Sequence, residues 1–134
     1  MGLQRLTPEG LFKPAAYSQV VVATGRRMVF VSGQVSIDAD GKLVAPGDVV
    51  GQARQVYANL RAALESAGAQ AADVVKLTTY VVGYKPELRP RLGEARSTLF
   101  GPGALPASTL VGVQALAEPG YLIEVEAIAA IDQA

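Results

Sequence analysis

Two carboxylates near the C-terminus have the spacing that most clearly suggests chemistry. Glu124 and Glu126 stand two positions apart in the apolar run LIEVEAIAAI, which covers residues 122–131. Residues two apart on a strand point to the same face of a sheet. Burial of ionised groups is costly unless they have partners. The pattern therefore predicts a functional role or a specific partner for each carboxylate.

The two glutamates have different interpretations. In a half-buried cleft Glu124 could hold and activate a water molecule, because desolvation raises the pKa of a carboxyl group toward the range used in acid–base catalysis. The alternative is an ion pair across a subunit interface. For Glu126 we expect a structural partner instead, either a backbone amide or an arginine such as Arg27 or Arg96.

The composition excludes several classes of function. Twelve Lys and Arg balance twelve Asp and Glu, and the chain has neither histidine nor cysteine. Balanced charge argues against partners such as nucleic acid or an anionic membrane. Without His and Cys, the chain lacks the usual neutral-pH base, the thiol nucleophile and the common zinc ligands. A nucleotide-binding fingerprint is also missing, so we expect no metal and no cofactor.

The chain also lacks the sequence signals of export and of membrane insertion. No run reaches the roughly 18 uncharged apolar residues of a membrane span. The N-terminal segment has no apolar core of the kind found in signal peptides. We therefore expect a soluble, cytoplasmic protein with one domain over residues 1–134.

The elements that would position these residues can be read from apolar periodicity and turn residues. We expect a short strand near 3–6 and then a β-hairpin of 17–24 and 27–32 that turns at Gly25. A helix over 49–67, between Asp48 and Gly68, and a strand over 74–82 should follow. The chain should end with a helix over about 87–100, which has Pro90 in its first turn, and two strands around a turn at 118–120. The helical stripe is expected to comprise Val49, Ala53, Val56, Leu60, Ala63 and Ala67. This order predicts an α+β fold with two helices on one face of a sheet. Because the strands are apolar at consecutive positions, the other face should meet another subunit.

Six segments together resemble the YjgF/RidA family, also described as L-PSP endoribonuclease-like. They are TPEGLFKPAAYSQVV at 7–21, VFVSGQVSID at 29–38, QARQVYANLRAALESAGA at 52–69, DVVKLTTYVV at 73–82, PASTLVGVQAL at 106–116 and IEVEAIA at 123–129. The resemblance implies a chorismate-mutase-like or ferredoxin-like mixed sheet and a homotrimer whose sheets form a central barrel. It also implies clefts at the subunit interfaces that bind small carboxylate-bearing metabolites.

The resemblance further implies a deaminase of the 2-iminobutanoate/2-iminopropanoate type, which hydrolyses enamines and imines to ketoacids and ammonia. Glu124 matches the glutamate that holds the attacking water. The ligand-binding positions it implies are Tyr17 at the cleft edge and Ser32 and Gly33, whose backbone faces the ligand. The family arginine that binds the substrate carboxylate falls on Ser108, and an asparagine of the second helix falls on Gly93.

Serine cannot bind a carboxylate by charge, so this position weakens the expected deaminase activity. Ser108 and Thr109 could donate hydrogen bonds to a neutral ligand, or they could face an empty cleft. One of Arg89, Arg91 and Arg96 could reach the interface and replace the missing arginine, or all three could be solvated helix charges. Tyr17 could close the cleft or only pack at the interface.

Three functions therefore remain open from the sequence. The first is a RidA-like deaminase acting on an atypical substrate, with Glu124 orienting water. The second is a non-catalytic trimer that binds a metabolite or regulates a partner. The third is an endoribonuclease or translation inhibitor, which the neutral charge and the lack of histidine disfavour.

Overall fold

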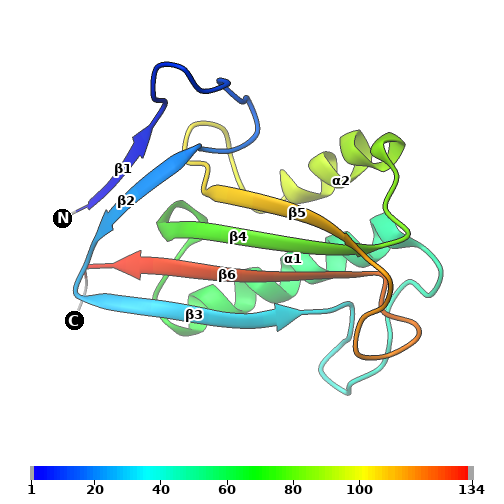
Figure 1. The fold of residues 1–134 in the computed structure, drawn as a ribbon. Coiled ribbons are helices and arrows are strands. Elements are labelled where there is room, and N and C mark those ends of the chain that lie inside the picture. The colour runs from blue at the N-terminus through cyan, green and yellow to red at the C-terminus, as the bar shows by residue number, and fades with distance from the viewer. Residues whose placement is uncertain (1, 133–134) are drawn as a thin grey trace.

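The structure is a computed structural model that describes residues 2–132. Two helices and two sheets make up the fold (Figure 1). The strands are β1 (Gly2–Leu6), β2 (Val20–Thr24), β3 (Arg27–Gln34), β4 (Val74–Val82), β5 (Ala107–Val113) and β6 (Ile123–Ile131). The helices are α1 (Val49–Ser66) and α2 (Arg89–Arg96), with short 3₁₀ turns at Ala71–Asp73 and Pro86–Leu88.

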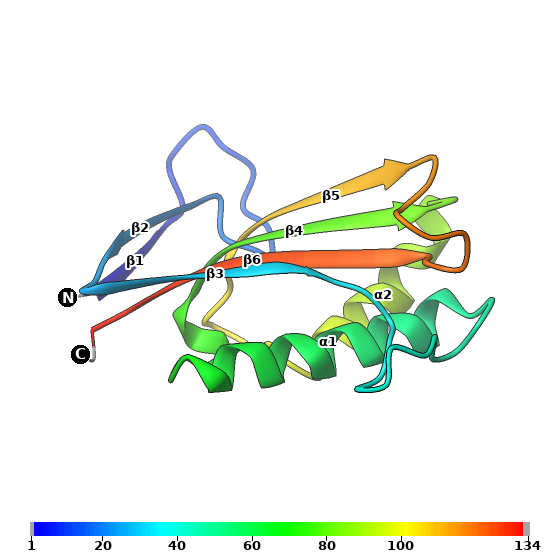
Figure 2. The same cartoon turned by 90° about the horizontal axis from the view of Figure 1, so that it is seen from below.

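The main sheet has four strands in the order β3-β6-β4-β5. Strands β4 and β5 are parallel, and β6 is antiparallel to both of its neighbours. Both helices lie on one side of this sheet, and neither covers the other side (Figure 2). This arrangement confirms the predicted α+β fold with two helices on one face. Strands β1 and β2 form a separate antiparallel ribbon beside it.

The predicted hairpin of residues 17–24 and 27–32 is wrong. Strand β2 pairs with β1, which confirms the short strand expected near 3–6, while β3 pairs with β6. The amide of Arg26 donates to the carbonyl of Ile131, so the chain joins β6 directly after the turn. Turn residues allow a change of direction but do not select the partner strand. Beside β6, Val29 and Val31 of β3 pack against the core, and this burial favours the long-range pairing.

Helix α1 begins and ends where the sequence predicts. The side chain of Asp48 accepts a hydrogen bond from the amide of Gly51 at 3.0 Å, and Gly68 at φ +77° follows the end of the helix. These are the usual N-cap and C-terminal signals. The buried stripe differs in part, because Leu64 is buried whereas the predicted Val49, Ala63 and Ala67 are only half-buried.

Gln52 on α1 ties this helix to the beginning of β6. Its side-chain nitrogen donates to the carbonyls of Ala45 and Gly120 at 3.2 and 3.1 Å. Its side-chain oxygen accepts from the amide of Leu122 at 3.0 Å. Gln52 is fully buried, and these bonds satisfy its amide. They fix the position at which β6 enters the sheet, two residues before Glu124.

Helix α2 is shorter than predicted and ends at Arg96 rather than near residue 100. Pro90 lies in its first turn, as expected, where no amide donor is needed. The hydroxyls of Ser97 and Thr98 donate back to the carbonyls of Glu94 and Ala95. Such local side-chain bonds compete with the continuation of a helix, which explains the early end.

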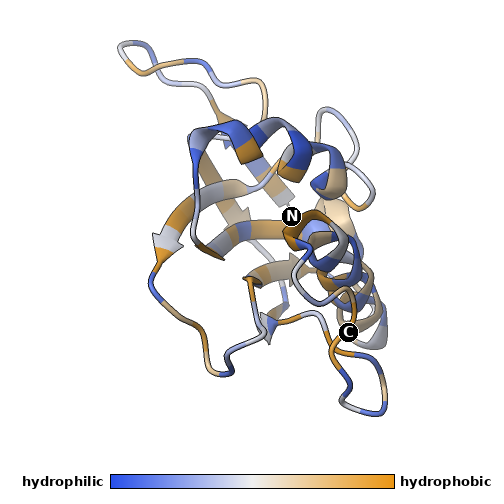
Figure 3. Cartoon of the chain, turned by 90° about the vertical axis from the view of Figure 1, so that its right-hand side faces the viewer, coloured by the Kyte–Doolittle hydropathy of each residue, from blue (hydrophilic) through white to orange (hydrophobic). Residues whose placement is uncertain are grey.

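The face of the sheet without helices, which we call the open face, is less apolar than the sequence suggests. Figure 3 shows hydrophobic segments on the strands and hydrophilic residues on both helices. On the open face, Met28 and Phe30 of β3 are 51% and 72% exposed, whereas the neighbouring strand β6 contributes Glu124 and Glu126. Large exposed apolar side chains beside carboxylates make this a mixed surface. Among the described helices, none is long and apolar enough to cross a membrane.

Candidate functional site

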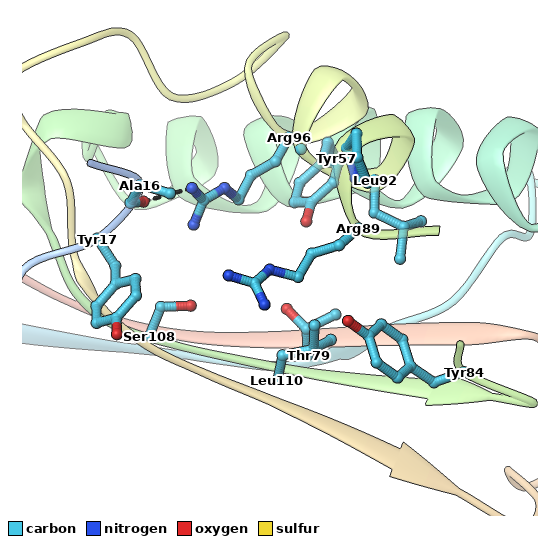
Figure 4. A pocket seen from close by; sticks show the side chains of 12 residues that line it. Ala16, Tyr17, Tyr57, Thr79, Tyr84, Arg89, Leu92, Arg96, Ser108 and Leu110 are labelled. Atoms are coloured by element: carbon cyan, nitrogen blue, oxygen red, sulfur yellow. Dashed lines mark hydrogen bonds between the residues drawn. The ribbon is translucent and has the colours of Figure 1, made fainter. Parts of the chain in front are cut away.

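A cavity opens between helix α2, the edge strand β5 and the segment before β2 (Figure 4). Its volume is about 640 Å³, which is within the usual range of small-molecule sites. It is lined by Ala16, Tyr17, Tyr57, Thr79, Tyr84, Arg89, Pro90, Leu92, Gly93, Arg96, Ser108 and Leu110. Apolar walls with a few polar groups are typical of ligand sites.

Two of the polar lining residues are buried. Tyr57 from α1 is 3% exposed and Thr79 from β4 is 7% exposed. Burial raises the pKa of Tyr57 to about 12, although the nearby charge of Arg96 and a hydrogen bond with Thr79 lower it. The phenol of Tyr57 therefore stays protonated at neutral pH and remains a hydrogen-bond donor.

Two arginines of α2 reach the cavity because of their spacing. Arg89, Leu92 and Arg96 stand at intervals of three and four residues, so they lie on one side of the helix. Leu92 is buried and holds this side toward the cavity. Arg89 and Arg91 are both exposed, but Arg91, the third arginine considered from the sequence, does not line the cavity.

The two arginines in the cavity have different environments. The guanidinium of Arg96 donates to the carbonyl of Ala16. The guanidinium of Arg89 extends toward the middle of the cavity (Figure 4), and no group among the described residues accepts a hydrogen bond from it. No Asp or Glu is found among the described residues that line the cavity. The cavity therefore has a net positive charge.

Ser108 and Thr109 point to opposite faces of the sheet. Strand β5 pairs in parallel register with β4, so that Ser108 lies beside Leu77 and Thr109 lies beside Thr78. Leu77 belongs to the core under the helices, and Ser108 lines the cavity on that side. Thr109 instead accepts a hydrogen bond from the ammonium of Lys76 at 3.0 Å. Within one chain, these two residues cannot contact the same ligand.

Tyr17 shares the cavity with Ser108 (Figure 4). The next residue, Ser18, fixes its position through two bonds to the segment before β5. The amide of Ser18 donates to the carbonyl of Pro106 at 3.0 Å, and its hydroxyl donates to the carbonyl of Leu105 at 2.7 Å. These contacts hold residues 17 and 108 together although they are far apart in the sequence.

Ser32 and Gly33 lie in a bulge of β3 on the other side of the structure. Val31 pairs with Ala127 and Gln34 with Val125, so two residues of β3 oppose the single residue Glu126 of β6. A bulge of this kind redirects side chains near the break in pairing. Here the bulge lies where the backbone of Gly33 comes close to the side chain of Glu124 on β6.

The carboxylate of Glu124 occupies the space in which a side chain at Gly33 would lie. A Cβ atom built at Gly33 collides with Oε2 of Glu124 and crowds the rest of that carboxyl group. Glycine is therefore the residue that admits the carboxylate at this position. Glu124 pairs with Tyr80 across β4 and β6 and is half-buried. The sequence-predicted residues Ser32, Gly33 and Glu124 are thus brought together, but away from the cavity.

Glu126 has a different partner from the one predicted. The hydroxyl of Tyr80 donates to Oε1 of Glu126 at 2.5 Å, whereas Arg27 and Arg96 donate to backbone carbonyls. This hydrogen bond is the main cause that raises the pKa of Tyr80, with smaller contributions from burial and from the nearby carboxylates. The expectation of an arginine or backbone partner was therefore wrong, while the expectation of a structural role agrees with this contact.

Tyr57 and Thr79 line the cavity although neither was predicted from the sequence as a site residue. Strand alternation in VVKLTTYVV places Thr79 on the same face as Leu77 and Val81, so the sequence predicts that Thr79 faces the core. Tyr57 directly follows Val56 of the helical stripe. No sequence signal showed that these two residues meet below α2, since that contact depends on how the helices pack.

Comparisons with known proteins give a consistent result. Residues 11–131 match the family model described as Endoribonuclease L-PSP. A RutC family protein of Pyrococcus abyssi is 37% identical over 113 residues, which cover 84% of each chain. The 2-iminobutanoate/2-iminopropanoate deaminase of Rattus norvegicus is 37% identical over 85% of this chain and 79% of its own.

A solved structure is also closely similar. It is a Yersinia pestis protein, YyfB, described as a protein of unknown function of the conserved Rid family. It superimposes with a TM-score of 0.90 at 37% identity, covering 98% of this chain and 100% of that chain. Agreement over almost the whole length extends the likeness from single motifs to the complete fold.

Proposed function

This chain belongs to the YjgF/RidA family, and we propose that it hydrolyses an imine or enamine at a cleft formed between two of its copies. The observation that carries this proposal is the carboxylate of Glu124 held over Gly33 on the open face. A half-buried carboxylate that packs against backbone is suited to orient a water molecule. A relative at 37% identity is named as an imine deaminase, which supports the same chemistry.

The positions of the candidate residues require a second copy. Glu124, Ser32 and Gly33 lie on the open face, while Ser108 and Tyr17 line the cavity on the helix side. One ligand can contact both groups only where the open face of one copy meets the cavity of the next. The resemblance implies a homotrimer for this contact, and the exposed Met28 and Phe30 supply apolar surface for it.

The proposed reaction needs only water and the groups named. As the water oxygen bonds to the imine carbon, Glu124 accepts a proton from the water and passes it to the imine nitrogen. In the resulting carbinolamine, Glu124 transfers the hydroxyl proton to the nitrogen, the carbon–nitrogen bond breaks, and ammonia leaves behind a ketone. The net change is imine plus water to ketone plus ammonia. Tyr17 and Ser108 border the substrate in this arrangement.

The test is an ammonia-release assay with freshly generated 2-imino acids. We expect activity above the rate in buffer and a loss of about 10²–10⁴-fold in the Glu124→Gln variant, the range for removal of a general base. Glu65→Gln, at an exposed position of α1, is the matched control and should keep the wild-type rate. Activity at the background rate, or full activity in Glu124→Gln, would contradict the proposal.

A non-catalytic metabolite-binding role is the second candidate. It is favoured by Ser108, which adds no charge where the family pattern has its carboxylate-binding arginine. Tight binding of an oxo acid without any hydrolysis of the matching imine would support this role over the enzymatic one.

A further inference from the structure

We propose that Arg89 binds the carboxylate of the ligand in this cavity, and that the ligand is a 2-imino or 2-oxo acid with a bulky apolar or aromatic side chain. This inference rests on the proposed function for the site but concerns a different residue and a different property. It assigns to helix α2 the anion contact that Ser108 of β5 cannot make.

The cavity carries a positive charge. The described residues that line the cavity include Arg89 and Arg96 and no carboxylate. Charged side chains that face a partly enclosed space are best stabilised by an opposite charge at short range. Because the described part of the chain supplies no counter-ion here, the cavity selects an anionic ligand.

The two arginines are not equivalent, which singles out Arg89. Arg96 donates to the carbonyl of Ala16 and lies near the phenol of Tyr57. Arg89 has no acceptor among the described residues, and its guanidinium extends into the open part of the cavity (Figure 4). The planar guanidinium can donate two parallel hydrogen bonds to one carboxylate. Arg96 is then a structural support, and Arg89 is the group free to bind.

The cavity also has room for more than a short acid. Its volume of about 640 Å³ compares with roughly 30 Å³ for one molecule of liquid water. Gly93 and Ser108 keep its borders open, and a Cβ atom built at Gly93 meets nothing within 4 Å. In the single chain, a four-carbon acid would leave most of this space unfilled.

The residues that line the cavity indicate which ligand side chain would occupy the remaining space. Leu92 and Leu110 are apolar, and the rings of Tyr17 and Tyr84 lie near opposite ends of the cavity (Figure 4). Aromatic rings pack well on such surfaces in offset or edge-to-face contacts. A carboxylate at Arg89 with an aromatic body between these walls therefore fits the cavity better than a small aliphatic acid.

Calorimetry on the full-length protein tests this inference with stable probes. We expect phenylpyruvate to bind more tightly than 2-oxobutanoate. Arg89→Gln should weaken phenylpyruvate binding at least tenfold, or about 1.4 kcal/mol. Arg91→Gln, on the same helix but outside the cavity, should bind as the wild type does. The methyl ester of phenylpyruvate, which lacks the charge, should bind as weakly to the wild type as the acid binds to Arg89→Gln.

Several results would overturn the inference. They are equal binding by Arg89→Gln and the wild type, equal binding of acid and ester, no preference for the aromatic acid, or no binding of either acid by the wild type. A smaller sedimentation coefficient for Arg89→Gln would also overturn it, since Arg89 would then be an assembly contact.

The two proposals fail separately. If imines are hydrolysed in a Glu124-dependent way while Arg89→Gln binds normally, the inference is wrong and the proposed function stands. If Arg89→Gln loses phenylpyruvate but the wild type hydrolyses no imine, the anion site stands and the proposed function is wrong.

Discussion

The two faces of the main sheet differ in charge, and only one of them is covered by helices. The helix-covered face contains the core and a cavity with Arg89 and Arg96. The open face carries Glu124 and Glu126 beside the exposed Phe30. Neighbouring residues of one strand are divided between these faces, so closeness in the sequence does not mean membership of one site. A site that uses both faces has to be completed by a second copy.

The opposite charges of the two faces fit such a contact. Arginines border the cavity, while Glu124 and Glu126 outnumber Lys76 on the open face. Complementary charges orient partners and disfavour incorrect registers, although they add little affinity by themselves. The exposed apolar side chains of β3 would supply most of the affinity.

The largest expected effect is on assembly. Phe30 is 72% exposed on the open face, and replacement by Asp would place a charge in a contact that excludes water. We expect Phe30→Asp to weaken self-association by about 100-fold or more, the effect of losing an aromatic hot spot. Sedimentation velocity over a range of concentrations measures this change.

Phe30→Leu is the matched control for the assembly experiment, since it keeps an apolar side chain on the open face. It should retain most of the self-association. If Phe30→Asp sediments as the wild type does, the open face is not the contact between copies, and a site that joins the open face to the cavity is contradicted.

The helix-covered face should in addition lose stability at high pH, because it buries the phenol of Tyr57. Burial raises the pKa of Tyr57 from 10.0 to about 12, so the folded state favours the neutral phenol. This stabilisation is complete below about pH 10 and is lost as pH rises toward 12, since the unfolded chain ionises first. The shift corresponds to roughly 3 kcal/mol of the free energy of unfolding.

Urea unfolding of the wild type and Tyr57→Phe at about pH 9 and pH 11.5 measures this loss. Tyr57→Phe should lose less stability over that interval, because it has no phenol to ionise. Parallel losses in the two proteins would show that the side chain at residue 57 is not buried in its neutral form.

Local signals were sufficient to predict several elements of the fold. Strand β4 at Val74–Val82, the Asp48 cap of α1 and the place of Pro90 in α2 agree with the sequence analysis. The pairing of β3 could not be predicted from these local signals, because its partner β6 lies about a hundred residues later in the chain. Such pairing is decided by the burial that both strands gain, which a turn at Gly25 does not reveal.

For the site, the sequence predicted residue types better than their grouping. Glu124 and Gly33 do meet on the open face, and Ser108 and Tyr17 do share the cavity. The division between these pairs follows from strand alternation, which also separates Ser108 from Thr109. The position of Arg89 could not be predicted, because it depends on where α2 begins and how it packs.

Mixing two inactive variants tests most directly whether the site joins the open face of one copy to the cavity of another. Glu124→Gln damages the open face, and Ser108→Glu places a repelling carboxylate in the cavity. Each should be inactive alone. Co-refolded in equal amounts, they should recover about a quarter of the wild-type rate, because random assembly joins the two intact faces at about one interface in four. No activity above that of the separate variants would contradict a site shared between copies.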